Sequence, residues 1–73
     1  MENINIYLLR TQLNNHLKER NLSRLQFCTK HNISYDKIQT LFNPKYKGVH
    51  ISVLFLFKIT SILGTNIYDY IQN

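Results

Sequence analysis

The fold is decided by residues 22–42, which read LSRLQFCTKHNISYDKIQTLF. A helix is predicted to begin after Ser23, because Ser23 and Gln26 have the Ser-x-x-Gln spacing of a capping box. We expect it to run through Leu25 to about His31, because Asn32 is the next residue that adopts a left-handed turn at low cost. Its inward side consists of Phe27 and Cys28.

A second helix is predicted over Tyr35–Phe42, with Ser34 as its N-cap. Its apolar side consists of Ile38, Leu41 and Phe42, and its polar side of Tyr35, Asp36, Lys37, Gln39 and Thr40. Two short helices joined by Asn32-Ile33-Ser34 are typical of a helix-turn-helix, whose second helix enters the major groove of DNA.

Three more helices are predicted around this pair. The first follows the apolar stripe Ile6, Leu9, Leu13 and Leu17 and ends near Arg20-Asn21. After a main loop at Asn43–Gly48, a helix is capped by Ser52, reaches Leu63 and is closed by Gly64. The last short helix is capped by Asn66 and contains Ile67, Tyr70 and Ile71.

The composition fits one all-α domain over residues 1–73, a compact bundle of five short helices in which only residues 1–5 are expected to be loose. Hydrophobic residues make up 44% of the chain, with one proline and two glycines. The lone Cys28 excludes an internal disulfide and favours a reducing compartment. With no signal peptide, and with Val53–Phe57 as the longest apolar stretch, we expect a cytoplasmic protein without membrane association.

Positive charge is concentrated in one part of the chain, whose formal net charge is +5. Residues 18–47 contain seven of the Lys and Arg side chains and two acidic ones, which by itself accounts for the +5 (seven minus two). Such a field suits a polyanion, because each neutralised phosphate releases condensed counterions. The alternative is that these lysines only solvate exposed helix faces.

A longer pattern extends from about Leu9 to Ile71. It consists of Leu22-Ser23, Phe27-Cys28, Lys30, Asn32-Ile33-Ser34, Ile38, Leu56, Ile59, Leu63-Gly64 and Asn66. In this pattern the chain resembles the Cro and phage-repressor-like helix-turn-helix domains, the XRE family. The resemblance implies a lambda-repressor-like bundle and a sequence-specific double-stranded DNA-binding transcriptional regulator of the bacterial cytoplasm or nucleoid. A repressor or Cro-like protein of a phage, plasmid or mobile element, or an antitoxin, fits this description.

The chain departs from the family at three positions. Leu17 and Phe42 stand where the family often has an Arg and a Glu that pair, and replacing both with apolar residues removes the need to desolvate two charges. Arg24 stands where a Gln is common, and its guanidinium still donates to a phosphate.

The family's functional positions map onto two groups of residues. The base-reading candidates are Tyr35, Asp36, Lys37, Gln39 and Thr40. The phosphate-binding candidates, which fix the register without reading sequence, are Arg24, Asn43, Lys45, Tyr46 and Lys47. The alternatives are that the Tyr35 ring packs over the turn and that Lys45 and Lys47 are solvated loop charges.

The helix after Ser52 is more apolar than one small core requires. The core is expected to use Val53, Leu56, Ile59, Thr60 and Leu63. The surplus predicts a homodimer interface at Leu54, Phe55, Phe57 and Ile62, which would present two reading helices to a palindromic operator. The alternative is that Tyr68 and Tyr70 of the last helix cover this surface.

Other chemistries are disfavoured. His16, His31, His50 and Cys28 lack the close spacing of metal ligands, so no metal or other cofactor is expected. Without a glycine-rich phosphate loop, and with four acidic residues in total, neither an enzyme nor a small-molecule substrate is expected. The main rival is a protein-interaction module on the same fold, such as an anti-repressor or an inhibitor of a nucleic-acid enzyme.

Overall fold

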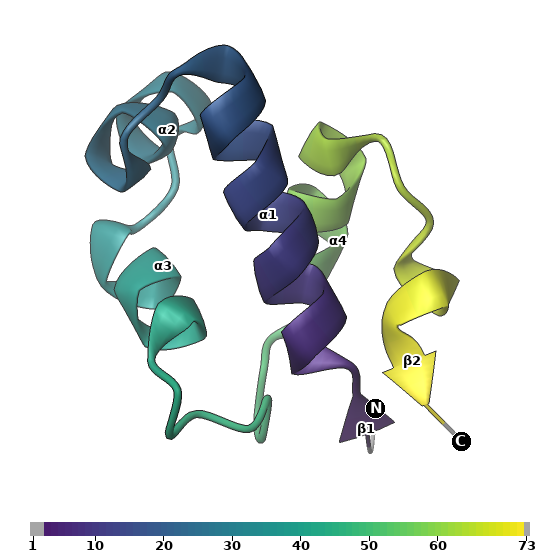
Figure 1. Cartoon of the computed structure of the whole chain (residues 1–73). Coiled ribbons are helices and arrows are strands. Elements are labelled where there is room, and N and C mark those ends of the chain that lie inside the picture. Colours follow the sequence, from purple (N-terminus) through teal and green to yellow (C-terminus); the bar gives the residue numbers. More distant parts are fainter. Residues whose placement is uncertain (1–2, 73) are drawn as a thin grey trace.

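Four α-helices and one short 3-10 helix account for most of the structure (Figure 1). The computed structural model describes residues 3–72. The helices are, in chain order, α1 (Ile6–Arg20), α2 (Arg24–His31), α3 (Tyr35–Phe42), α4 (Val53–Leu63) and the 3-10 helix η1 (Ile67–Tyr70). Two strands of two residues, β1 (Asn3–Ile4) and β2 (Ile71–Gln72), pair antiparallel and bring the two ends of the described chain together.

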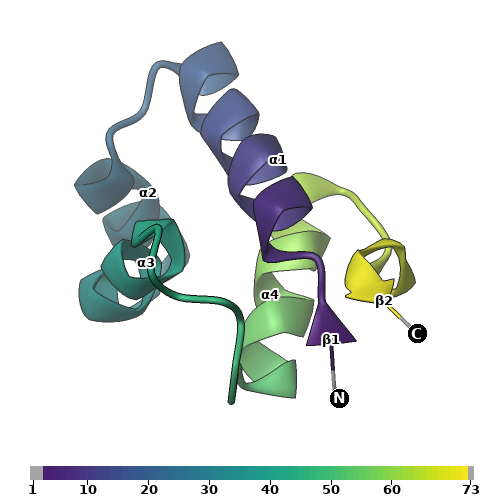
Figure 2. The same cartoon turned by 60° about the horizontal axis from the view of Figure 1, so that its bottom comes forward.

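Helix α1 lies between the α2–α3 pair and the part formed by α4 and η1 (Figures 1 and 2). It therefore contributes to both halves of the core. The fully buried residues include Leu9 and Leu13 of α1, Phe27 of α2, Ile38 of α3 and Leu56 of α4. The expectation of a small, compact all-helical domain is confirmed.

The capping residues of the sequence determine where the helices end. Ser23 Oγ accepts a hydrogen bond from the Gln26 backbone N–H (3.0 Å), and Gln26 Oε1 accepts one from the Ser23 N–H (2.8 Å), which is the predicted capping box. Asn21 and Asn32 both adopt the left-handed conformation, with φ of 54° and 55°. Gly64 closes α4 in the same conformation.

Three predicted details of the helices differ in the structure. Ser34 occupies the N-cap position of α3, but its side chain makes no capping hydrogen bond. Val53 was expected in the core and is 51% exposed, because this first residue of α4 lines an open groove instead of lying beneath another element. The last helix is a four-residue 3-10 turn, and Ile71 leaves it to pair with Ile4.

The expectation of a loose segment at residues 1–5 does not hold for residues 3–5, and Met1 and Glu2 lie outside the described residues. Ile4 is buried and pairs with Ile71 across the β1–β2 ladder. Asn5 caps α1, since its Oδ1 accepts from the Leu8 N–H at 3.0 Å, and its own N–H donates to the Tyr70 carbonyl at 2.6 Å. The segment is held by partners from the other end of the chain.

The loop between α3 and α4 closes on β1 through a glycine. Gly48 is buried and has a φ of +85°, and a Cβ placed on it would collide with Ile4 Cγ2. Only glycine provides both this backbone conformation and this close approach. The contact holds one end of the 43–52 loop against the N-terminal strand.

Two histidines enclose the central aromatic ring of the core. The Phe27 ring meets His16 edge-on at a centroid distance of 5.7 Å and His31 at 4.8 Å. Burial lowers the pKa of His16, and Arg20 adds to this effect by repelling the imidazolium. Burial and the nearby Lys30 lower the pKa of His31 in the same way.

These lowered pKa values predict a loss of stability on mild acidification. Between the unfolded pKa of 6.5 and the lower folded value, the unfolded chain binds more protons, so stability is complete above pH 6.5 and declines below it. We expect the melting temperature to fall by a few degrees from pH 7.5 to pH 5.5, and the fall to be smaller for His16→Leu. The control is His50→Asn, which removes an exposed histidine at a left-handed position that Asn tolerates. An equal fall in His16→Leu and wild type would contradict the assignment.

Candidate nucleic-acid interface

Helices α2 and α3 are joined by the three residues Asn32–Ser34 and pack against each other. The left-handed Asn32 reverses the chain, and the Ile33 N–H donates to the Cys28 carbonyl at 2.9 Å. Ile38 and Leu41 bury one side of α3 in the core. The opposite side of α3 therefore faces outward.

All five base-reading candidates lie on the exposed surface of α3. Tyr35, at its first turn, is 40% exposed. The five side chains do not form one cluster, however. Gln39 contacts α2, whereas Asp36, Lys37 and Thr40 line a hollow on the side of α3 toward the loop and α4.

The Gln39 side is organised by Arg24, the first residue of α2. Arg24 Nη1 donates to Gln39 Oε1 at 3.0 Å, and the Arg24 guanidinium carbon lies 4.0 Å from the centroid of the Phe42 ring. Phe42 is half-buried and Leu17 is buried. The Phe42 ring therefore supports the Arg24 cation.

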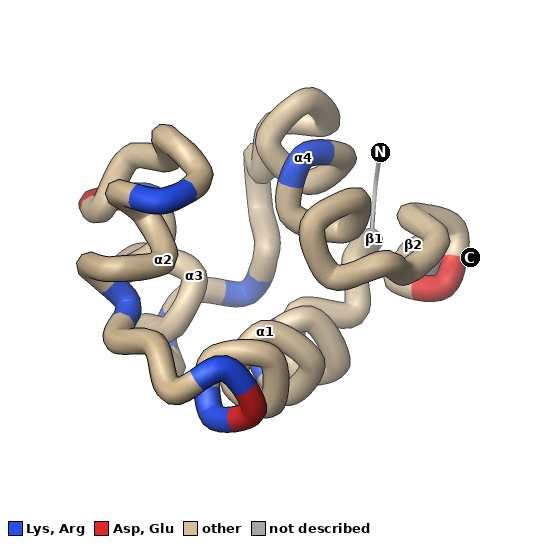
Figure 3. The backbone as a smooth tube through the Cα atoms, turned by 90° about the horizontal axis from the view of Figure 1, so that it is seen from above, with Lys and Arg blue, Asp and Glu red and all other residues tan. Residues whose placement is uncertain are grey.

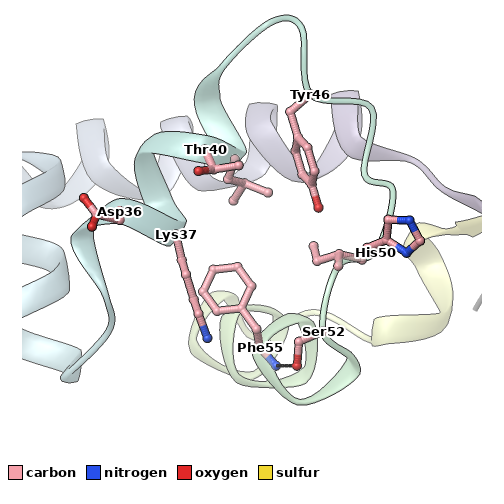
Figure 4. A pocket seen from close by; sticks show the side chains of 9 residues that line it. Asp36, Lys37, Thr40, Tyr46, His50, Ser52 and Phe55 are labelled. Carbon is pink, nitrogen blue, oxygen red and sulfur yellow. Dashed lines mark hydrogen bonds between the residues drawn. The ribbon is translucent and has the colours of Figure 1, made fainter.

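The other side of α3 borders a hollow of about 260 Å³ (Figure 4). The Phe55 ring lies beside the Lys37 chain, with the Lys37 ammonium 5.6 Å from the ring centroid, and the Tyr46 hydroxyl points into the hollow. Burial raises the pKa of Tyr46, so its hydroxyl stays protonated. Because Tyr46 is half-buried and packs against the core, it is less accessible than the other phosphate-binding candidates.

The remaining phosphate-binding candidates lie on the exposed loop after α3. Asn43 Oδ1 accepts from the Lys45 N–H at 3.0 Å and shapes the first turn of the loop. Lys47 Nζ lies 3.5 Å from the Pro44 carbonyl, which is a long contact that leaves its charge facing solvent. Lys45 and Lys47 are both exposed on the loop that follows α3.

Basic residues are spread over all four α-helices and the loop after α3, and acidic residues are fewer (Figure 3). Within residues 3–72, one ion pair is present, between neighbours Arg20 and Glu19 at 3.8 Å. Arg24, Lys37, Lys45 and Lys47 therefore have no carboxylate partner among the described residues. Cations without acidic partners are available to an external polyanion.

Sequence reasoning missed Arg10, which organises the loop. From α1 its Nε donates to the Leu41 carbonyl at 2.6 Å, and its Nη2 donates to the carbonyls of Asn43 and Tyr46. Carbonyl groups at the end of a helix have no partner within the helix, and Arg10 provides one. The only signal in the sequence was an arginine next to Leu9 in the buried stripe of α1.

The four residues predicted for a dimer interface fall into two pairs. Leu54 and Phe57 are 81% and 58% exposed, whereas Phe55 and Ile62 are half-buried against the core. Tyr70 is buried but Tyr68 is 76% exposed, so η1 leaves Leu54 and Phe57 uncovered. We call the exposed residues Val53, Leu54, Phe57 and Tyr68 the α4 patch; they border an open groove between α4 and η1.

None of the helices described over residues 3–72 is both long and apolar enough to cross a membrane. In the same part of the chain, no three His, Cys, Asp or Glu side chains are grouped so as to hold a metal ion.

No protein-family model, curated protein or solved structure matches the chain.

The Arg10 contacts predict a test of stability. Arg10→Met keeps an apolar stem and removes the guanidinium, which takes a hydrogen bond from three carbonyls. The Asn43 carbonyl still accepts from the Tyr46 N–H at 3.0 Å. We expect a loss of about 2 kcal/mol or more in the free energy of unfolding, measured by urea denaturation at pH 7.5. Arg20→Met is the matched control, because Arg20 makes only an exposed pair, and its change should stay within about 0.5 kcal/mol. Equal losses in the two variants would show that Arg10 does not anchor the loop.

Proposed function

We propose that this protein is a sequence-specific double-stranded DNA-binding transcriptional regulator of the repressor or Cro-like kind. In this proposal α2 and α3 act as a helix-turn-helix, and α3 reads the major groove. The observation that carries it is the exposed polar side of α3, which is flanked by cations without carboxylate partners among the described residues.

The dimensions of α3 support this role. An eight-residue helix is about 12 Å long, which is comparable with the width of the major groove. Because Ile38 and Leu41 anchor the back of α3 in the core, its polar side chains project from a rigid support. The exposed positions available to bases are those of Tyr35, Asp36 and Thr40, with Lys37 and Gln39 beside them.

The residues that flank α3 have the properties expected of contacts to the DNA backbone. Arg24 lies at the start of α2 and contacts α3 through Gln39, and Lys45 and Lys47 lie on the loop that follows α3. Asp36 opposes phosphate binding but can accept from a cytosine amino group. Phosphate contacts would thus fix the position of the protein, while α3 reads the bases.

Salt dependence tests the proposal. Binding of the purified protein to a mixed duplex pool should weaken steeply as salt rises, and Lys45→Ala with Lys47→Ala should shrink the slope by about one unit per lost phosphate contact. Lys30→Ala, which removes a charge from the last turn of α2 outside the candidate contacts, should leave the slope unchanged. If wild type binds no duplex even at low salt, DNA is not the partner.

We also propose that the α4 patch forms a homodimer. Its exposed side chains are apolar and uncharged, so two copies of the patch can face each other without burying an unpaired charge. A two-fold dimer uses the same patch on both subunits, and it would present two α3 helices to a palindromic operator. Phe55 and Ile62 pack on the core and do not line the groove beside this patch, so the proposed interface does not include them.

A charge placed in the α4 patch tests the dimer. Wild type should elute as a dimer at high micromolar concentration in size-exclusion chromatography with light scattering. Leu54→Glu should be monomeric, because a carboxylate would be buried without a partner. Tyr7→Glu, which places the same charge at an exposed aromatic residue of α1, should remain dimeric. A monomeric wild type would remove the dimer from the proposal.

The second candidate function is a protein-interaction module on the same fold. It is favoured by the α4 patch, because an apolar groove beside α4 also suits a different protein chain. The duplex-binding and size-exclusion experiments also distinguish a DNA-binding regulator from a protein-interaction module. A monomeric protein that binds no duplex at low salt would favour the interaction module.

A further inference from the structure

The side-chain amide of Gln39 has a defined orientation. Its neighbour Arg24 has five N–H donors and no acceptor, so only the carbonyl oxygen of Gln39 can face the guanidinium favourably. The distance of 3.0 Å between Arg24 Nη1 and Gln39 Oε1 is that of a good hydrogen bond. With the oxygen turned toward α2, the Gln39 NH₂ group is left for an external ligand.

The guanidinium that orients Gln39 is itself held in place. It lies 4.0 Å from the centroid of the Phe42 ring, and Phe42 is half-buried against the core. Gln39 and Phe42 are three residues apart on α3, so they lie on the same side of the helix and contact Arg24 together. The capping box at Ser23 also fixes the backbone from which Arg24 extends.

We infer that Gln39 distinguishes keto bases from amino bases, with Arg24 as its positioning residue. This role rests on the DNA-binding function proposed above and adds to it the class of base that is read. A freely rotating glutamine reads adenine with one donor and one acceptor. In this protein the Gln39 oxygen is turned toward Arg24, so the NH₂ donors are the groups left to meet an external base.

The donors and acceptors on the major-groove edges of the bases determine which bases the Gln39 NH₂ group can bind. At their exocyclic groups, guanine and thymine present the keto acceptors O6 and O4, whereas adenine and cytosine present the amino donors N6 and N4. The N7 acceptor is common to both purines, so only the exocyclic group separates the two classes. The Gln39 NH₂ group can donate to a keto oxygen and is repelled by an amino group. The inference therefore predicts guanine or thymine at one position of each bound site.

Selection from a random duplex pool tests the inference with two variants. Wild type should select a keto base over an amino base about tenfold at one position. Gln39→Glu keeps the shape and still accepts from Arg24, but it presents an acceptor outward, so the preference at that position should invert to adenine or cytosine. Arg24→Ala frees the Gln39 amide to rotate, so adenine should be accepted there and the tenfold ratio should collapse.

Lys45→Ala is the control, because it removes the same unit of net charge as either variant. It should weaken binding to all sequences without changing the base at any position. The same result in Arg24→Ala would show that Arg24 only contacts phosphate, and it would overturn the positioning role. Circular dichroism of each variant checks that the helices are retained.

The outcomes separate this inference from the function on which it rests. If wild type selects a site and both Gln39→Glu and Arg24→Ala retain the wild-type base at every position, the inference is wrong and the DNA-binding proposal stands. If wild type binds no duplex at low salt, the DNA-binding proposal fails, and the reading role of Gln39 fails with it.

Discussion

The guanidinium of Arg10 joins α1 to the end of α3 and to the loop that follows, by donating to carbonyls at Leu41, Asn43 and Tyr46. The helix end and the loop would otherwise expose carbonyl groups without partners at the edge of the core. With these bonds in place, the start of the loop that carries Lys45 and Lys47 is attached to the longest helix. The position of the candidate phosphate contacts thus depends on a residue that is not itself expected to touch DNA.

The outward side of α3 is divided between two environments. Gln39 belongs to a cluster with Arg24 and Phe42, in which a cation supported by an aromatic ring orients an amide. Lys37 and Thr40 face the hollow beside the loop and α4, where the Lys37 ammonium lies near the Phe55 ring. Arg24 therefore combines two roles in the proposed function, because a guanidinium has enough donors to bond Gln39 and a phosphate together.

Part of the surplus of apolar residues in α4 is buried within the domain. Phe55 and Ile62 pack against the core, and Tyr70 is buried through η1 with its hydroxyl donating to Thr65 at 2.8 Å. Leu54 and Phe57 remain exposed, because they lie on the side of α4 that faces away from the core. Apolar residues in this position favour a partner chain, and the proposed homodimer provides one.

The helices and most of the core follow from local features of the sequence, because a capping box, left-handed asparagines and apolar spacing act within a few residues of each other. The bounds of α3 and the burial of Phe27, Ile38 and Leu56 were predictable for this reason. Tertiary packing, which local sequence patterns do not predict, set the contacts of Arg10, the pairing of Ile4 with Ile71 and the exposure of Val53. It also decided the orientation of the Gln39 amide, since the Arg24 donor lies fifteen residues away in sequence and reaches Gln39 only when α2 and α3 pack together.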